Sequence, residues 1–139
     1  MAENKNENLN TILDATFKFA KKTAKEFYFK IWVKNSPKCP AFGGEVINIS
    51  HYGWEHLIHD ENKTKSDIMG RLFVLERVKF LLETATTFSE KRIIKNREYW
   101  VFDSVIEDVR LRVVVKSIDN QPKHFLTVIK KGTVEIHLI

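Results

Sequence analysis

The apolar residues of this chain change their spacing between its first two thirds and its last third. In residues 9–24 apolar side chains recur every three or four positions, which is the spacing of one helix face. In residues 109–118 they alternate with polar side chains, which is the spacing of a strand with one buried face. Helical segments followed by a run of strands with short turns predict an α+β fold.

Each predicted element is bounded by residues that favour caps or turns. We expect a helix from Leu9 to Lys25 or Glu26, a short helix capped by Ser50, and a helix from Ser66 to about Thr84. Between the first two helices, residues 27–33 and 45–49 are predicted to form a short strand pair. A C-terminal four-stranded antiparallel meander is predicted over residues 99–106, 109–118, 124–130 and 133–139, with turns at 119–122 and 131–132.

The domain organisation follows from the same pattern. Residues 1–8 are polar and rich in asparagine, and we expect them to be flexible. Residues 9–139 contain neither an internal repeat nor a low-complexity linker, and their length suits one ordinary domain. The sequence therefore predicts a single α+β domain behind a short flexible N-terminus.

The composition of the chain excludes several classes of protein and site. Cys39 is the only cysteine, which excludes a disulfide framework and a thiolate-rich zinc site. No apolar run approaches the roughly 20 residues of a membrane span, and the polar N-terminus is unlike a secretory signal, so we expect a cytoplasmic protein without a membrane partner. Neither a P-loop nor a GxGxxG motif is present, and we expect no cofactor. The net charge of +5 suits a polyanion such as nucleic acid, and equally suits a solvated basic surface.

Three of the five histidines, His51, His56 and His59, fall within nine residues. Imidazole titrates near physiological pH, so such a cluster can supply an acid, a base or a phosphate donor. In a helix His56 and His59 share a face, Tyr52 lies one turn before His56, and Glu55 points away from His59 but towards His51. A polar, half-exposed helix face explains the cluster as well. A metal site is the least favoured reading, because no third ligand lies at a suitable step.

The segment 109–118 carries cations on one face. Val109, Leu111, Val113 and Val115 form the predicted core face, and Arg110, Arg112 and Lys116 lie on the other. Arginine offers a planar fork that matches a phosphodiester, so this stripe is a candidate phosphate-binding surface. Charges that merely face solvent and prevent edge pairing produce the same alternation.

The following strand adds two further candidates. In regular geometry His124 and Thr127 lie on opposite faces, so only one of them can join the cationic face unless a bulge or a strand end frees His124. Tyr99 and Trp100 begin another predicted strand, where they either stack on bases or belong to the core.

These residues match the needs of RNA cleavage without a metal. The ribose 2′-OH is an internal nucleophile, so one base, one acid and cations around the phosphate suffice. In our first hypothesis, a metal-independent ribonuclease, His56 is the acid or base, and Arg110, Arg112 and Lys116 hold the phosphate. His51, His124 or Thr127 completes the site, and Tyr99 contacts RNA. The second hypothesis is a non-catalytic module that binds RNA or an acidic protein, and the third is a structural or partner-binding protein whose charges are only solvated.

The order of these elements also resembles a known group. Residues 47–50 lead into the aromatic-x-His-Leu element Trp54-Glu55-His56-Leu57, and residues 111–115 and 125–128 supply the sheet. Over residues 27–139 this is similar to the barnase/EndoU/colicin/RelE-like nuclease superfamily, particularly its phage-associated branches. The resemblance implies metal-independent RNA cleavage on an open sheet face, in a toxin or effector that an antitoxin or immunity protein would counter. Of the superfamily's catalytic residues, the resemblance implies a counterpart only at His56, in the aromatic-x-His-Leu element.

Members of this superfamily vary in their catalytic residues, and some have lost activity. Arg112, Lys116 and Thr127 occupy sheet positions where such proteins often keep functional groups. The resemblance therefore implies where the chemistry would lie, and leaves its exact residue set open.

Overall fold

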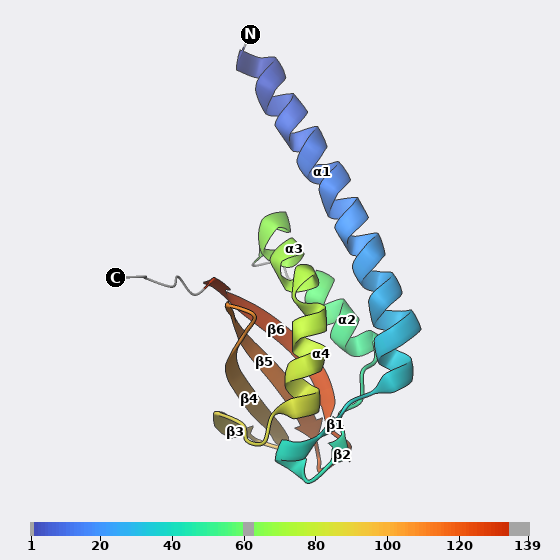
Figure 1. The fold of residues 1–139 in the computed structure, drawn as a ribbon, viewed down its shortest axis with the longest axis vertical. Helices are drawn as coiled ribbons and strands as arrows, with labels where there is room; N and C mark the ends of the chain where they lie inside the picture. Colours follow the sequence, from blue (N-terminus) through green and yellow to red (C-terminus); the bar gives the residue numbers. More distant parts are fainter. Residues whose placement is uncertain (1, 60–62, 134–139) are drawn as a thin grey trace, which may run out of the picture.

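A computed structural model of the chain describes residues 2–59 and 63–133, and its α+β architecture confirms the predicted fold class (Figure 1). A long N-terminal helix leads into a small two-stranded sheet, three helices and a four-stranded antiparallel sheet. The elements are α1 (Ala2–Glu26), η1 (Phe27–Trp32), η2 (Val33–Asn35), β1 (Lys38–Cys39), η3 (Pro40–Phe42), β2 (Glu45–Val46), α2 (His51–Ile58), α3 (Lys65–Phe73), α4 (Leu75–Thr84), β3 (Glu90–Ile94), β4 (Arg97–Ile106), β5 (Val109–Ile118) and β6 (His124–Thr133).

The main sheet has the strand order β3-β4-β5-β6, and its two faces differ in burial. One face packs against the helices, and Leu111, Val113 and Phe125 on it are almost completely buried. Figure 1 shows α4 lying across this face and α1 projecting far beyond the rest of the molecule. The opposite face bears exposed side chains such as Asp103 and Arg110, and we call it the open face. No helix in the described ranges is both long and apolar enough to cross a lipid bilayer.

The predicted strand at residues 27–33 is wrong. This segment continues α1 as the π-helix η1, which places Tyr28 and Trp32 one turn apart and wholly in the core. The Trp32 ring lies 4.9 Å from that of Phe125. Burial of large aromatic side chains against the sheet outweighs their preference for strands, which is a weak and context-dependent term. The helix also begins at Ala2, before the predicted Leu9.

Two further helix predictions need correction. Thr64, rather than Ser66, caps α3, because its side chain and that of Asp67 form a reciprocal capping box. The predicted single helix to Thr84 is divided at Val74, whose backbone leaves the helical region and separates α3 from α4. The amphipathic pattern runs through this break, so spacing alone did not reveal it.

The strand pair and the meander are also shifted relative to the sequence predictions. β2 covers only Glu45–Val46 and pairs with β1 rather than with residues 27–33. The exposed edge strand β3 was missed, because its charged residues show no alternation. Lys131 and Gly132 lie within β6 rather than in a turn, at a register shift where glycine marks a bulge. The predicted strand at 133–139 lies outside the described residues beyond Thr133. The predicted turn at 119–122 is confirmed by left-handed backbone at Asp119 and Asn120.

Candidate functional site

The short helix α2 is fixed to the edge of β6 by backbone pairing just before it begins. The amide of Asn48 donates to the carbonyl of Lys123 at 2.9 Å, and the amide of Phe125 donates to the carbonyl of Asn48 at 3.0 Å. Two residues later Ser50 occupies the N-cap position, and its carbonyl accepts a hydrogen bond from the buried Tyr28 hydroxyl at 2.5 Å. These contacts place the first turn of α2 beside the end of β6.

Glycine at position 53 allows this close approach. A Cβ atom at Gly53 would lie 2.7 Å from the Phe125 carbonyl oxygen and 2.7 Å from the Tyr28 hydroxyl. Trp54 and Leu57 then enter the core. The adjacent side of α2 carries Tyr52 and His56, one turn apart and directed towards the open face of the sheet.

Tyr52 is the centre of a group of chemically active side chains, which we call the Tyr52 cluster: Tyr52, His56, Tyr99, Lys116 and His124. Its ring centroid lies 4.6 Å from that of His56 and 5.0 Å from that of His124, in edge-on geometry. The ammonium of Lys116 donates to the Tyr52 hydroxyl at 3.1 Å. The same ammonium lies 5.6 Å from the ring centroids of both Tyr52 and Tyr99.

A bulge in β6 explains how His124 joins this cluster. Val114 pairs with Thr127 and Val115 pairs with Phe125, so Leu126 is an extra residue in the ladder. Because of this extra residue, His124 opposite Lys116 and Thr127 opposite Val114 fall on the same face. The sequence reasoning named a bulge or a strand end as what could free His124; the structure has the bulge, and His124 is also the first residue of β6.

Lys116 is unusual for a charged residue. It is only 6% exposed, and its partners in the described part of the chain are two tyrosines rather than a carboxylate. A buried ammonium loses hydration, and tyrosine faces and one hydroxyl offset that loss only in part. The arrangement leaves an unneutralised cation beside two imidazoles.

His124 is held in its neutral form by its surroundings. Burial lowers its pKa below the usual 6.5, the positive charge of Lys116 lowers it further, and a hydrogen bond to the backbone of Pro122 opposes the shift. Its Nε2 and the Thr127 Oγ1 are both shielded from solvent, with no hydrogen-bond partner among the described residues. The lowered pKa favours His124 in its neutral form, which can act as a base, although its Nε2 is covered in this conformation.

The other histidines of α2 lie outside the cluster. The Nε2 atoms of His51 and His59 each lie 3.0 Å from a carboxylate oxygen of Glu55, and both rings are largely exposed. The prediction that Glu55 points away from His59 is wrong, since residues four apart on either side of Glu55 share its helix face. His51, proposed above to complete the site, is thus separated from it.

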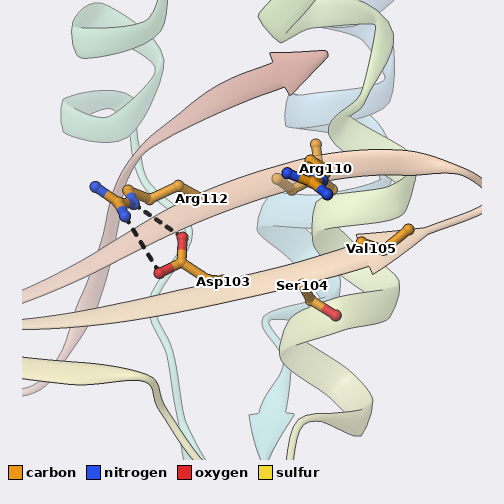
Figure 2. Close-up of a pocket in the computed structure, with 6 residues that line it drawn as sticks. Asp103, Ser104, Val105, Arg110 and Arg112 are labelled. Carbon is orange, nitrogen blue, oxygen red and sulfur yellow. Dashed lines mark hydrogen bonds and ion pairs between the residues drawn. The ribbon is translucent and has the colours of Figure 1, made fainter. Parts of the chain in front are cut away.

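The two arginines of β5 do not converge with Lys116 either. Arg112 makes a two-pronged pair with Asp103, with Nε–Oδ1 at 2.8 Å and Nη2–Oδ2 at 3.3 Å (Figure 2). This pairing raises the pKa of Arg112 through the hydrogen bond and the charge of Asp103. Arg112 and Arg110 lie four and six residues along β5 from Lys116, or about 13 and 20 Å at strand spacing. The cationic stripe is therefore not one phosphate-binding site.

Several contributors to the site were not identified from the sequence. Tyr52 had been placed one turn before His56 but given no role, and the i, i+4 spacing of a phenol and an imidazole was the available indication. Arg71 is buried on α3, and its Nη1 donates to the His56 carbonyl at 3.5 Å.

The aromatic pair of β4 divides as alternation requires, with Tyr99 at the cluster and Trp100 in the core.

Within residues 2–59 and 63–133, no three histidine, cysteine, aspartate or glutamate side chains are grouped so that they could hold a metal ion. What the Tyr52 cluster offers is proton transfer and charge stabilisation by two imidazoles, two phenols and one ammonium. No family model, curated protein or solved structure matches the chain.

Proposed function

We propose that this protein binds RNA and cleaves it without a metal ion at the Tyr52 cluster. The observation that carries the proposal is the buried Lys116 ammonium, which has no carboxylate partner among the described residues and lies beside a phenol flanked by two imidazoles. A buried cation of this kind suits an anionic ligand, and a phosphodiester that reaches it also meets the imidazoles.

The chemistry assigns one role to each group. His124, kept neutral, takes the proton from the ribose 2′-OH while the 2′-oxygen forms a bond to phosphorus. The bond from phosphorus to the 5′-oxygen breaks, and His56 in its protonated form gives that oxygen its proton. Lys116 and the Tyr52 hydroxyl stabilise the charge on the phosphate oxygens. The products are a 2′,3′-cyclic phosphate and a 5′-hydroxyl.

For RNA to enter the site, the Tyr52 ring has to move away from His124. A phosphate that takes the Lys116 ammonium from the Tyr52 hydroxyl would let the ring turn away from His124, whose Nε2 is covered in the free protein. The resemblance to the barnase/EndoU/colicin/RelE-like superfamily supports the proposal, because it implies metal-independent cleavage on an open sheet face. In a toxin or effector setting, an antitoxin or immunity protein would act by covering this cluster.

The helix α2 supplies a matched set of histidine variants for the test. Purified protein is incubated with total RNA in EDTA, and cleavage rates are compared for the wild type and for His56→Gln, His124→Gln, His51→Gln and His59→Gln. We expect the first two to lose about 10²- to 10⁴-fold, the usual contribution of a general acid or base. The two glutamate-paired histidines should be dispensable. Intact RNA at high protein concentration, or equal loss in all four variants, would contradict the proposal.

A second function, RNA binding without cleavage, is favoured by one observation. The His124 Nε2 and the Thr127 Oγ1 are both closed to solvent, so the proposed base is not presented in this conformation, although His56 is exposed. This alternative predicts affinity for RNA that falls steeply with salt, no turnover, and no effect of His56→Gln on binding. Measuring affinity and cleavage on the same RNA distinguishes the two functions.

A further inference from the structure

A hollow of about 360 Å³ adjoins the Tyr52 cluster where β5 ends. It is lined by Asn48, Ser50, Tyr52, Ile118, Pro122 and His124. The rings of Tyr52 and His124 meet there at 79°, and Ile118 and Pro122 add apolar surface. A concave, mostly apolar lining with a few polar groups is the usual form of a small-ligand site.

Two polar side chains in the hollow, Ser50 and Asn48, can each offer an oxygen atom to a ligand. Ser50 stands at the N-cap of α2, where serine normally accepts a hydrogen bond from the first turn, yet its side chain makes no capping bond. The Asn48 amide nitrogen donates to the Lys123 carbonyl at 3.1 Å, which fixes the amide group and leaves its oxygen as an acceptor. The hollow therefore presents one hydroxyl and one oriented amide oxygen beside two aromatic rings.

The hollow also has a defined relation to Lys116. Ile118 follows Lys116 by two residues on the same face of β5, a separation of about 7 Å. A ligand that reaches both places needs an anionic group and a flat, partly apolar group joined by a short polar linker. A nucleotide has this form, with its phosphate, ribose and base.

We propose that the hollow is a nucleobase subsite, so that the Tyr52 cluster acts on single-stranded RNA with one base unstacked into it. This inference rests on the proposed function and deepens it, because a base must leave its helix to reach such a pocket. Packing of the base against the Tyr52 ring, which turns away from His124 as substrate enters, and against Ile118 and Pro122 supplies most of the affinity, and Ser50 and Asn48 read the base edge.

The test uses mononucleotides, which bind whether or not the protein cleaves RNA. Isotope-labelled full-length protein is titrated by NMR with AMP, GMP, CMP and UMP, and with ribose 5-phosphate, which is the same sugar phosphate without a base. We expect at least one nucleotide to bind about fivefold or more tightly than ribose 5-phosphate, the lower end of what base–aromatic stacking contributes. The shifted resonances should include Ser50 and Ile118.

Ser50→Ala is the discriminating variant, because its hydroxyl supports no capping bond and its loss should leave the melting temperature unchanged. It should weaken binding of the preferred nucleotide but not of ribose 5-phosphate, and Ser66→Ala on the exposed start of α3 serves as the control. Equal affinity for ribose 5-phosphate, or shifts confined to the sheet near Arg112, would overturn the subsite. Nucleotide binding at the hollow without RNA cleavage would uphold the subsite and overturn the proposed function. RNA cleavage at a rate that is the same for Ser50→Ala and for single- and double-stranded RNA would uphold the proposed function and overturn the subsite.

Discussion

The open face of β5 has two ends that look alike in sequence and differ in chemistry. At one end Lys116 is buried between two tyrosines and near two imidazoles, without a carboxylate within the described ranges. At the other end Arg112 is partly exposed and doubly bonded to Asp103. The same alternation of charge thus yields a cation that still lacks an anion and a cation that is already neutralised. The neighbours on β4 and α2, rather than the cations themselves, decide which end can act.

The largest difference between the two ends should appear in the RNA cleavage rate when each cation is exchanged for methionine. Lys116→Met should lower the RNA cleavage rate about 10²- to 10³-fold, because charge stabilisation at the phosphate is lost. Its melting temperature should hold or rise, since replacing a buried ion by an apolar side chain of similar volume is often neutral or stabilising. Arg112→Met should change the rate little. Cleavage assays and thermal melts on both variants check the comparison, and equal losses at the two ends would break it.

The next effect concerns how α2 is held over the Lys116 end. Gly53→Ala should lower the free energy of unfolding by about 1–3 kcal/mol, the usual cost of overpacking, because its methyl group meets the Phe125 carbonyl and the Tyr28 hydroxyl. Glu55→Ala, two residues along the same helix, removes only exposed pairs and should cost at most about 1 kcal/mol. Urea denaturation of both variants measures the difference. An undiminished stability for Gly53→Ala would mean that α2 is not held as described.

A smaller effect is expected from freeing the Arg112 end. Asp103→Asn removes the carboxylate that occupies Arg112, so RNA should bind more tightly at low salt. The slope of log affinity against log salt should steepen by about 0.9 if one more phosphate contact forms on duplex-like RNA, or about 0.7 on a single strand. Fluorescence anisotropy across a salt series provides the measurement. An unchanged slope would show that this end of the face does not meet RNA at all.

The smallest effect is a titration shift at His124. Its folded pKa lies below the unfolded value, so the folded state resists protonation and its stability falls as the pH drops below 6.5, levelling off once the folded pKa is passed. Lys116→Met should raise the His124 pKa by removing a nearby positive charge, but not fully to 6.5, because burial is the larger cause. NMR titration of the imidazole protons reads this directly. If Lys116→Met leaves the His124 pKa unchanged, the charge of Lys116 does not act on His124.

The sequence predicted the fold class, the β4–β5 pair and the core face of β5 because each rests on local alternation. It misassigned residues 27–33, where aromatic side chains in a π-helix satisfy burial better than in a strand. It also missed β3, whose residues are nearly all exposed and carry no burial pattern. Local spacing indicates which face of an element is apolar, but not which neighbour that face will meet.

The candidate site was only partly predictable for the same reason. His56, His124, Lys116 and Tyr99 were all named, yet the sequence grouped them with Arg110, Arg112 and His51, which lie elsewhere. Arg112 is paired with Asp103 on β4, and His51 is paired with Glu55 on the same face of α2. These ion pairs keep both residues out of the cluster. Tyr52, which joins the group together, had no role in the sequence reasoning because only His56 is a partner from its own helix, whereas Lys116 and His124 come from β5 and β6.

The bulge at Leu126 lets β6 hold one residue more than a regular ladder would, with His124 still opposite Lys116. Replacing Leu126 by another apolar residue leaves the count unchanged, so a complete scan of point substitutions would report this position as tolerant. Deleting it would leave a regular ladder in which Phe125 still opposes Val115 and His124 still opposes Lys116, so the cluster would keep its arrangement. Loss of one residue at this point is therefore a change that the edge of the sheet can accept without losing the arrangement of the cluster.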